Sequence, residues 1–125
     1  MDGEVARARL ASEGLQVRYL ELDVTDDHAV TTLRATLGPV DVLVNNAGLA
    51  LGVTKSWENK MKDVETVFKV NVFSIYKLLN KVLPRMRERN AGHVINVSSV
   101  AGLDAYPGGS AYCATKHAVE AITLA

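Results

Sequence analysis

The stretch VDVLVNNAG, residues 40–48, decides the fold class of this chain. Its apolar residues lack the alternation of a strand with one wet face, and such a run is typical of a strand buried on both faces of a parallel sheet. Gly38 and Pro39 end the helical pattern before it, and the Asn and Gly residues after it are turn formers. We therefore predict a buried parallel strand between two helices.

Helix and strand patterns alternate along the rest of the chain. A helix is expected after Thr25 as N-cap, and Pro84 is expected to kink a long helix whose apolar stripe includes Phe68 and Ile75. The expected helices are 4–13, 25–37, 60–89 and one from Ser110 onward, and the expected strands are 15–22, 40–46 and 93–98. This order predicts an α/β fold with a doubly wound parallel sheet.

The composition of the 125 residues, 48% of them hydrophobic, indicates a single globular domain. There are 14 basic and 14 acidic side chains, and the densest basic stretch, 85–89, is short and interrupted, so no nucleic-acid partner is expected. The one cysteine excludes an internal disulfide, and no run approaches the ~20 apolar residues of a membrane span. We expect a cytoplasmic protein without a membrane partner.

Small polar residues follow each expected strand. Asp23 follows the first strand, the turn 45–48 follows the second, and Ser98 and Ser99 follow the third. Ligands of doubly wound sheets bind beyond these carboxyl ends, although each residue alone also suits an ordinary turn or helix cap. Asn71 lies on the apolar stripe of the long helix, where a buried amide costs roughly 1–3 kcal/mol unless it has a partner. Together these positions predict a polar site at one edge of the sheet.

Tyr112 and Lys116 are four residues apart in the last helix, so their side chains are neighbours on one face. Taken alone, this pair also fits a surface lysine that lies along a tyrosine ring. A neutral phenol is a poor base near neutral pH, and an adjacent ammonium favours the phenolate. The pair therefore also suits proton transfer at a substrate oxygen.

Five features in this order resemble those of the short-chain dehydrogenase/reductase family: LDVTD at 22–26, NNAG at 45–48, Asn71 in the long helix, Ser99 in VINVSSVAG at 94–102 and the Tyr-x-x-x-Lys pair. The resemblance covers nearly the whole chain. It implies a Rossmann-type fold and hydride transfer between nicotinamide and a secondary alcohol or ketone. Within the family, the stretches NNAGLALG and GLDAYPGGSAYCATKHAV are most similar to enzymes that oxidise serine, allo-threonine and other 3-hydroxy acids.

The resemblance implies roles for single residues. Tyr112 transfers the proton, Lys116 binds the nicotinamide ribose, Ser99 holds the substrate oxygen, and Asn71 organises a water on the proton path. The implied cofactor-binding residues are Asp23, which contacts the adenine, with Asn45, Ala47, Gly48, Tyr112 and Lys116. The implied cofactor is NADP or NAD, and the likeness to the serine-oxidising enzymes favours NADP.

The resemblance also implies partners. One is a small-molecule alcohol or carbonyl substrate, and the others are further copies of a complete enzyme in a homodimer or homotetramer. Phe73 and Tyr76 lie off the apolar stripe of the long helix, where another copy would pack, although two scattered exposed aromatic residues fit equally well.

Other reactive side chains are expected to be structural. The three histidines lack metal-ligand spacing, so no metal site is expected. Ser98 is expected to bond the backbone, and Cys113 is expected to pack as a small apolar residue.

A member of this family begins with a strand and a turn of the pattern T-G-x-x-x-G-x-G, which binds the pyrophosphate, and these 125 residues contain no such turn. We expect residues 1–125 to be a partial NAD(P)-binding domain without the first two strands and the C-terminal portion of the fold. Two functions stay open. The chain is part of an oxidoreductase, or it is a non-catalytic fragment or degenerate copy that keeps the motif without binding a cofactor.

Overall fold

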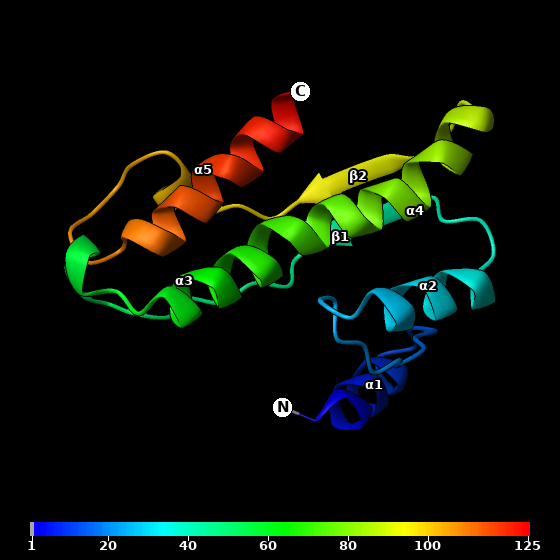
Figure 1. Ribbon diagram of the computed structural model, residues 1–125. Coiled ribbons are helices and arrows are strands. Elements are labelled where there is room, and N and C mark those ends of the chain that lie inside the picture. The colour runs from blue at the N-terminus through cyan, green and yellow to red at the C-terminus, as the bar shows by residue number, and fades with distance from the viewer. Residues whose placement is uncertain (1) are drawn as a thin grey trace.

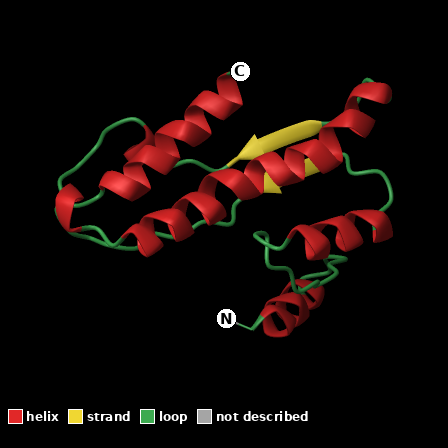
Figure 2. Ribbon diagram, in the orientation of Figure 1, coloured by secondary structure: helices red, strands yellow, loops and turns green. Residues whose placement is uncertain are grey.

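The computed structural model describes residues 2–125, which form a small parallel sheet with helices packed against it (Figures 1 and 2). The elements in chain order are α1 (Gly3–Ser12), α2 (Asp27–Thr36), β1 (Val42–Asn45), η1 (Ser56–Glu58), α3 (Met61–Phe68), η2 (Lys69–Phe73), α4 (Ser74–Glu88), β2 (His93–Asn96), η3 (Val100–Gly102) and α5 (Ser110–Leu124). The segments η1 and η3 are short 3-10 helices, and η2 is a π-helical turn.

Strands β1 and β2 pair in parallel, with Val42 opposite His93 and Asn45 opposite Asn96. The pairing continues one residue further, because the Val97 N–H donates to the Asn45 carbonyl at 2.9 Å. The predicted strands over 40–46 and 93–98 are therefore confirmed in position and direction, although both are shorter than expected. Since the two strands end together, the loops that follow them begin at the same edge of the sheet.

The two faces of this sheet differ in burial. Val42 and Val44 are each 54% exposed and Ile95 is 43% exposed, whereas Asn45, which points to the other face, is only 6% exposed. Helices therefore cover one face of β1 and β2, and no other element within residues 2–125 covers the second face. The prediction that β1 is buried on both faces is wrong for the described residues, because the layer that its apolar run requires is not formed by them.

Residues 15–22 do not form the predicted strand. The backbone runs without regular structure from Leu15 to Asp23, and Leu20 is 44% exposed. A strand satisfies its N–H and C=O groups on a neighbouring strand, and the sheet of the described residues consists of β1 and β2 alone. The segment has the apolar pattern of a strand, but among residues 2–125 it pairs with neither β1 nor β2. Tyr19 instead packs its ring over Gly3 of α1.

Helix α2 begins one residue later than predicted. Asp26, not Thr25, is its N-cap, and the Asp26 carboxylate accepts the His28 and Ala29 N–H groups at 2.8 and 3.1 Å. Thr25 instead donates both its N–H and its hydroxyl to Asp23 Oδ1, each at 2.8 Å. The predicted cap is wrong because Thr25 already bonds the residue before the turn.

Helices α3 and α4 and the turn η2 form one continuous rod from Met61 to Glu88, which is the green segment of Figure 1 and confirms the long helix predicted over 60–89. Val67 and Val82 are 0% and 5% exposed on its buried stripe. The helix continues past Pro84. Helix α5 packs along α3 and η2, and α2 packs against α4.

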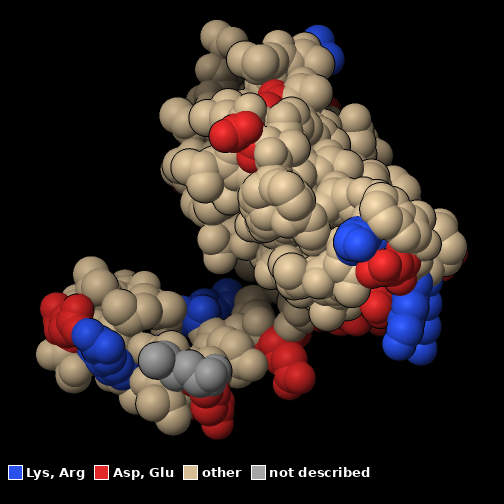
Figure 3. Space-filling view, turned by 90° about the vertical axis from the view of Figure 1, so that its left-hand side faces the viewer, with Lys and Arg blue, Asp and Glu red and all other residues tan. Residues whose placement is uncertain are grey.

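The surface seen in Figure 3 is mostly uncharged, with lysine, arginine and carboxylate side chains scattered over it in small groups. One ion pair joins the end of α4 to the start of β1, with Arg89 Nη1 3.0 Å from Asp41 Oδ1. Among residues 2–125, none of the helices combines the length and the apolar character that crossing a membrane requires.

Candidate active site

A hollow of about 320 Å³ lies at the carboxyl ends of β1 and β2. Its walls are Asn46, Gly48, Leu49, Ala50, Val97, Ser98, Tyr112 and Lys116. These residues come from the turn after β1, the turn after β2 and the first half of α5. The structure thus brings Gly48, Tyr112 and Lys116 together, from segments that are up to 68 residues apart (116 minus 48).

Lys116 is the charged group of this hollow. It is 6% exposed, its Nζ donates to the Val97 carbonyl at 2.8 Å, and the same atom lies 5.8 Å from the centroid of the Tyr112 ring. An ammonium has three N–H donors, and among the described residues only Val97 accepts one of them. Lys116 therefore keeps donors for a polar group that enters the hollow, beside the phenol of Tyr112.

The backbone around Lys116 is held by the turn after β2. A Cβ atom on Gly102 of η3 would lie 2.7 Å from Ser98 Oγ and 2.9 Å from the Lys116 carbonyl oxygen. Glycine is therefore required at this position for η3 to approach α5 so closely. Ser98 Oγ donates to the Lys116 carbonyl at 3.5 Å, which confirms that Ser98 bonds the backbone.

Asn71 lies in the π-helical turn η2 and is 1% exposed. Its Oδ1 accepts the Leu49 N–H at 2.9 Å, and its Nδ2 donates to the Leu49 carbonyl at 2.9 Å and to Thr115 Oγ1 at 3.0 Å. The polar partner that a buried amide requires is thus present. A Cβ atom on Gly48 would lie 3.4 Å from Asn71 Oδ1 and 3.7 Å from Lys116 Nζ, so Gly48 keeps the space between them open.

Ser99 is not part of the wall of this hollow. It is the N-cap of η3, and its Oγ accepts the Ala101 N–H at 3.2 Å. Its neighbour Ser98 lines the hollow in its place. The structure therefore places Ser99 next to the site rather than in its wall.

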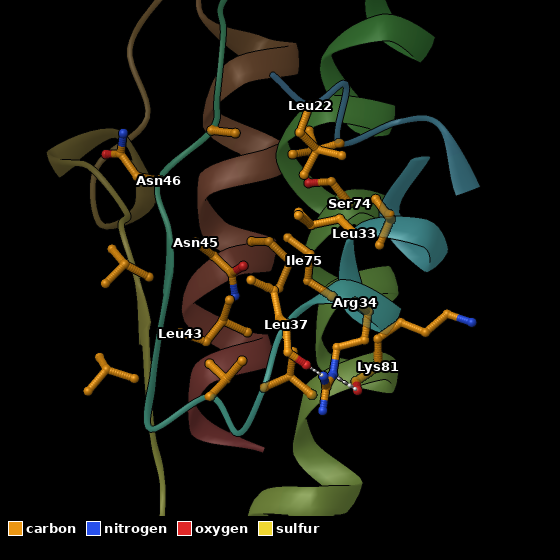
Figure 4. Close-up of a pocket in the computed structure, with 18 residues that line it drawn as sticks. Leu22, Leu33, Arg34, Leu37, Leu43, Asn45, Asn46, Ser74, Ile75 and Lys81 are labelled. Atoms are coloured by element: carbon orange, nitrogen blue, oxygen red, sulfur yellow. Dashed lines mark hydrogen bonds between the residues drawn. The ribbon is translucent and has the colours of Figure 1, made fainter. Parts of the chain in front are cut away.

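Asn45 and Ala47, two of the predicted cofactor residues, line a different hollow of about 340 Å³ between α2, β1 and α4 (Figure 4). Its walls are mainly Leu, Val and Ile side chains, and Arg34 closes one end by donating to the Leu37 and Lys81 carbonyls at 3.0 and 3.2 Å. Asn45 Nδ2 donates to Asn96 Oδ1 at 2.8 Å, whereas Asn45 Oδ1 is buried without a partner among the described residues.

Asp23 lies on an exposed turn and lines neither hollow, although its neighbours Leu22 and Val24 line the larger one. The Thr25 N–H, then the Thr25 hydroxyl and the charge of Lys77, hold the pKa of the Asp23 carboxyl below its usual range, so it is ionised near neutral pH. Lys77 of α4 fixes this turn, since its Nζ donates to the Thr25 carbonyl at 2.7 Å and lies 3.0 Å from Asp27 Oδ1. The carboxylate is therefore held in place and open to solvent.

The lysine and the tyrosine lie one helical turn apart at the carboxyl edge of a parallel sheet, which is where ligands of such folds bind. Residues 2–125 match the family model described as short chain dehydrogenase. The chain therefore belongs to the short-chain dehydrogenase family.

Within the family, the chain is most like 3-hydroxy acid and serine dehydrogenases. It is 36% identical to an NADP-dependent 3-hydroxy acid dehydrogenase of Schizosaccharomyces pombe, over 98% of this chain and 49% of that protein. The crystal structure of serine dehydrogenase from Escherichia coli superposes with a TM-score of 0.80 and 40% identity, over 84% of this chain and 50% of that one. The closed form of serine dehydrogenase complexed with NADP+ gives a TM-score of 0.85 and 37% identity, over 95% and 50% of the two chains. The chain thus spans about half the length of the curated relatives it matches.

Proposed function

We propose that residues 1–125 are part of the NAD(P)-binding domain of an oxidoreductase that transfers hydride between nicotinamide and a secondary alcohol or the corresponding ketone. The observation that carries this proposal is the buried ammonium of Lys116, which faces the Tyr112 ring in a hollow at the carboxyl edge of the sheet. A buried charge with spare donors is costly unless polar groups meet it. A polar ligand that enters this hollow would meet that need.

The residues of the hollow fit the ribose and nicotinamide end of a dinucleotide. Lys116 has N–H donors for ribose hydroxyls, and Gly48 leaves open the space that a side chain would take beside Lys116 Nζ and Asn71 Oδ1. Nicotinamide, when bound, supplies the hydride acceptor or donor. Asp23 is an ionised, outward-facing acceptor suited to a more distant part of the nucleotide. Asn45 and Ala47 line the other hollow. We propose that they lie along the cofactor only because they are neighbours of Gly48 at the end of β1.

The side chains of the protein would transfer the proton to or from the substrate oxygen. Tyr112 would give its hydroxyl proton to a ketone oxygen or accept one from an alcohol, with the Lys116 ammonium 5.8 Å from the centroid of its ring. Ser99 is proposed to hold the substrate oxygen from the rim of the hollow. Asn71 is proposed to act on the proton path, where its side chain also holds the loop at Leu49.

The finer assignments rest on the relatives. Their names support NADP as the cofactor and 3-hydroxy acids, serine among them, as the substrate class. Further copies of the chain are proposed as partners through the exposed aromatic residues Phe73 and Tyr76 of η2 and α4, which are 50% and 51% exposed.

A second function is favoured by one specific observation. The 125 residues contain no T-G-x-x-x-G-x-G turn, so the chain by itself has nothing that grips a pyrophosphate in the way its relatives are expected to. A non-catalytic remnant that keeps the Tyr112 and Lys116 pair would have the same local structure.

The experiment that separates the two is a chimera, here called the completed chain, in which these residues replace the matching half of the Escherichia coli serine dehydrogenase. We expect the completed chain to bind NADPH by fluorescence titration and to oxidise serine or allo-threonine by absorbance. The 125-residue chain alone should do neither. Tyr112→Phe should reduce turnover by at least about 10³-fold and leave NADPH affinity nearly unchanged, because only the proton-transferring hydroxyl is removed.

Tyr19→Phe is the matched control, since it removes a hydroxyl from a tyrosine that is 39% exposed and lines neither hollow. It should leave turnover unchanged. Full activity of the Tyr112→Phe chimera would end the catalytic assignment, and a folded chimera that binds no dinucleotide would support the remnant.

A further inference from the structure

Thr115, a residue that the proposed mechanism does not use, is the centre of a buried chain of hydrogen bonds. It is 0% exposed, its Oγ1 donates to the Tyr112 carbonyl at 2.7 Å, and the same oxygen accepts from Asn71 Nδ2 at 3.0 Å. A threonine hydroxyl has one proton. Because that proton goes to the Tyr112 carbonyl, Thr115 Oγ1 offers only lone pairs to Asn71.

This arrangement favours the same orientation of the Asn71 amide as the backbone of Leu49 does. Since Thr115 Oγ1 can only accept, the NH₂ group of Asn71 must point toward it, and the Asn71 oxygen must then point away. In that orientation Oδ1 accepts the Leu49 N–H and the second Nδ2 hydrogen reaches the Leu49 carbonyl, each at 2.9 Å. A reversed amide would place donor against donor at Leu49 and acceptor against acceptor at Thr115.

Because the Asn71 amide bonds the backbone of Leu49, it also holds the Gly48–Leu49 wall of the hollow in place. Leu49 and Gly48 face Lys116 and Tyr112 across it, and the space at Gly48 lies between Asn71 Oδ1 and Lys116 Nζ. Thr115 belongs to α5, Asn71 to η2, and Leu49 to the turn after β1. The chain of bonds therefore ties the helix that carries Tyr112 and Lys116 to the loop opposite them.

We propose that Thr115 is a positioning residue of the candidate site: its hydroxyl, together with the backbone of Leu49, sets the orientation of the Asn71 amide and thereby holds the Gly48–Leu49 wall at its distance from Lys116. Its meaning for catalysis rests on the proposed function, whereas its effect on Leu49 does not.

A threonine in a helix often bonds the carbonyl of a preceding residue with no further role, so a matched threonine is needed as a control. Thr123 of the same helix provides it. Thr123 Oγ1 donates to the Val119 carbonyl at 2.7 Å and accepts from Asn96 Nδ2 at 3.0 Å, but the residue is exposed and lies outside both hollows. The two threonines thus make the same bonds in different places.

The test compares Thr115→Val, which keeps the shape and removes the hydroxyl, with Thr115→Ser, which keeps the hydroxyl, and with Thr123→Val. The first readout is amide hydrogen exchange in the 125-residue chain, taken as the Leu49 rate divided by that of Val82 in α4. We expect this ratio to rise about tenfold or more in Thr115→Val, because a buried Asn71 donor loses its acceptor, and to change less than about twofold in the other two variants.

An unchanged ratio in Thr115→Val, an equal rise in Thr115→Ser, or a Leu49 amide without protection in the unsubstituted chain would overturn the proposal. The second readout is turnover by the completed chain, where Thr115→Val should lower kcat about tenfold with KM within about twofold and Thr123→Val should lower neither. Turnover that is equal in the two valine variants would also count against Thr115. A completed chain that never turns over contradicts the proposed function and leaves the Leu49 exchange result to decide the proposal.

Discussion

Gly102→Ala tests how tightly the turn after β2 holds the backbone of α5. The added methyl would lie 2.7 Å from Ser98 Oγ, 2.9 Å from the Lys116 carbonyl oxygen and 3.1 Å from the Lys116 carbonyl carbon. Two of these three atoms belong to the backbone of a helix, so they cannot rotate away as a side chain does. Either η3 or α5 must move, and overpacking of this kind costs ~1–3 kcal/mol.

Urea unfolding of the 125-residue chain, followed by circular dichroism, measures this cost. With a denaturant slope of about 1–3 kcal/mol per molar, the midpoint should fall by roughly 1 M. Gly38→Ala is the matched control, because a Cβ atom on Gly38 has no neighbour within 4 Å. That substitution should leave the midpoint unchanged or raise it, since alanine stabilises a compatible site by about 0.4–1 kcal/mol. A midpoint for Gly102→Ala at or above that of the unsubstituted chain would refute the close approach of η3 and α5.

Two further predictions concern charge and association. The pKa of Asp23 is lowered in the fold by Thr25 and Lys77, so its stabilising effect is complete above the ordinary aspartate pKa of about 4 and is lost as pH falls through the lower folded pKa. The unfolding free energy of the unsubstituted chain should therefore fall more steeply below about pH 4 than that of Asp23→Asn, and parallel pH profiles would contradict this. In the completed chain, the double change Phe73→Ser and Tyr76→Ser should reduce the sedimentation coefficient toward that of a monomer, whereas Trp57→Ser, which alters a residue 79% exposed on η1, should not. Equal sedimentation of the unsubstituted chain and the double variant would contradict the proposed interface.

Local pattern was sufficient for most elements of this fold. The long helix over 61–88 was predictable because its apolar stripe has helical spacing, and the strand at 42–45 was predictable because a short apolar run ends in turn residues. The prediction of a strand over 15–22 was wrong for a non-local reason. A strand forms only when its backbone bonds a neighbouring strand, and the sequence of the segment does not reveal whether it does so. The predicted N-cap of α2 was wrong by one residue, because three residues that can cap a helix, Asp23, Thr25 and Asp26, lie within four positions.

The candidate site was predictable in part. Spacing alone placed Tyr112 beside Lys116, and the polarity of Asn71 on an apolar stripe predicted a buried partner for it. That this partner is Thr115 required the structure. One signal was present in the sequence: Thr115 lies three residues after Tyr112, on the same face of the helix. Ser98 and Asn46 were harder to foresee as wall residues, because which of two adjacent serines or asparagines faces a hollow depends on the exact twist of the turn.

The uncovered face of β1 and β2 has a consequence for how the isolated chain behaves in solution. Val42, Val44 and Ile95 present apolar side chains to water there, and β1 has one edge whose backbone groups bond no other strand among residues 2–125. An apolar strand with a free edge is a template on which a second polypeptide can add, and natural proteins protect such edges against aggregation. The soluble yield of the 125-residue chain should therefore fall steeply with its own concentration, so hydrogen exchange and unfolding of this chain are best measured in dilute samples.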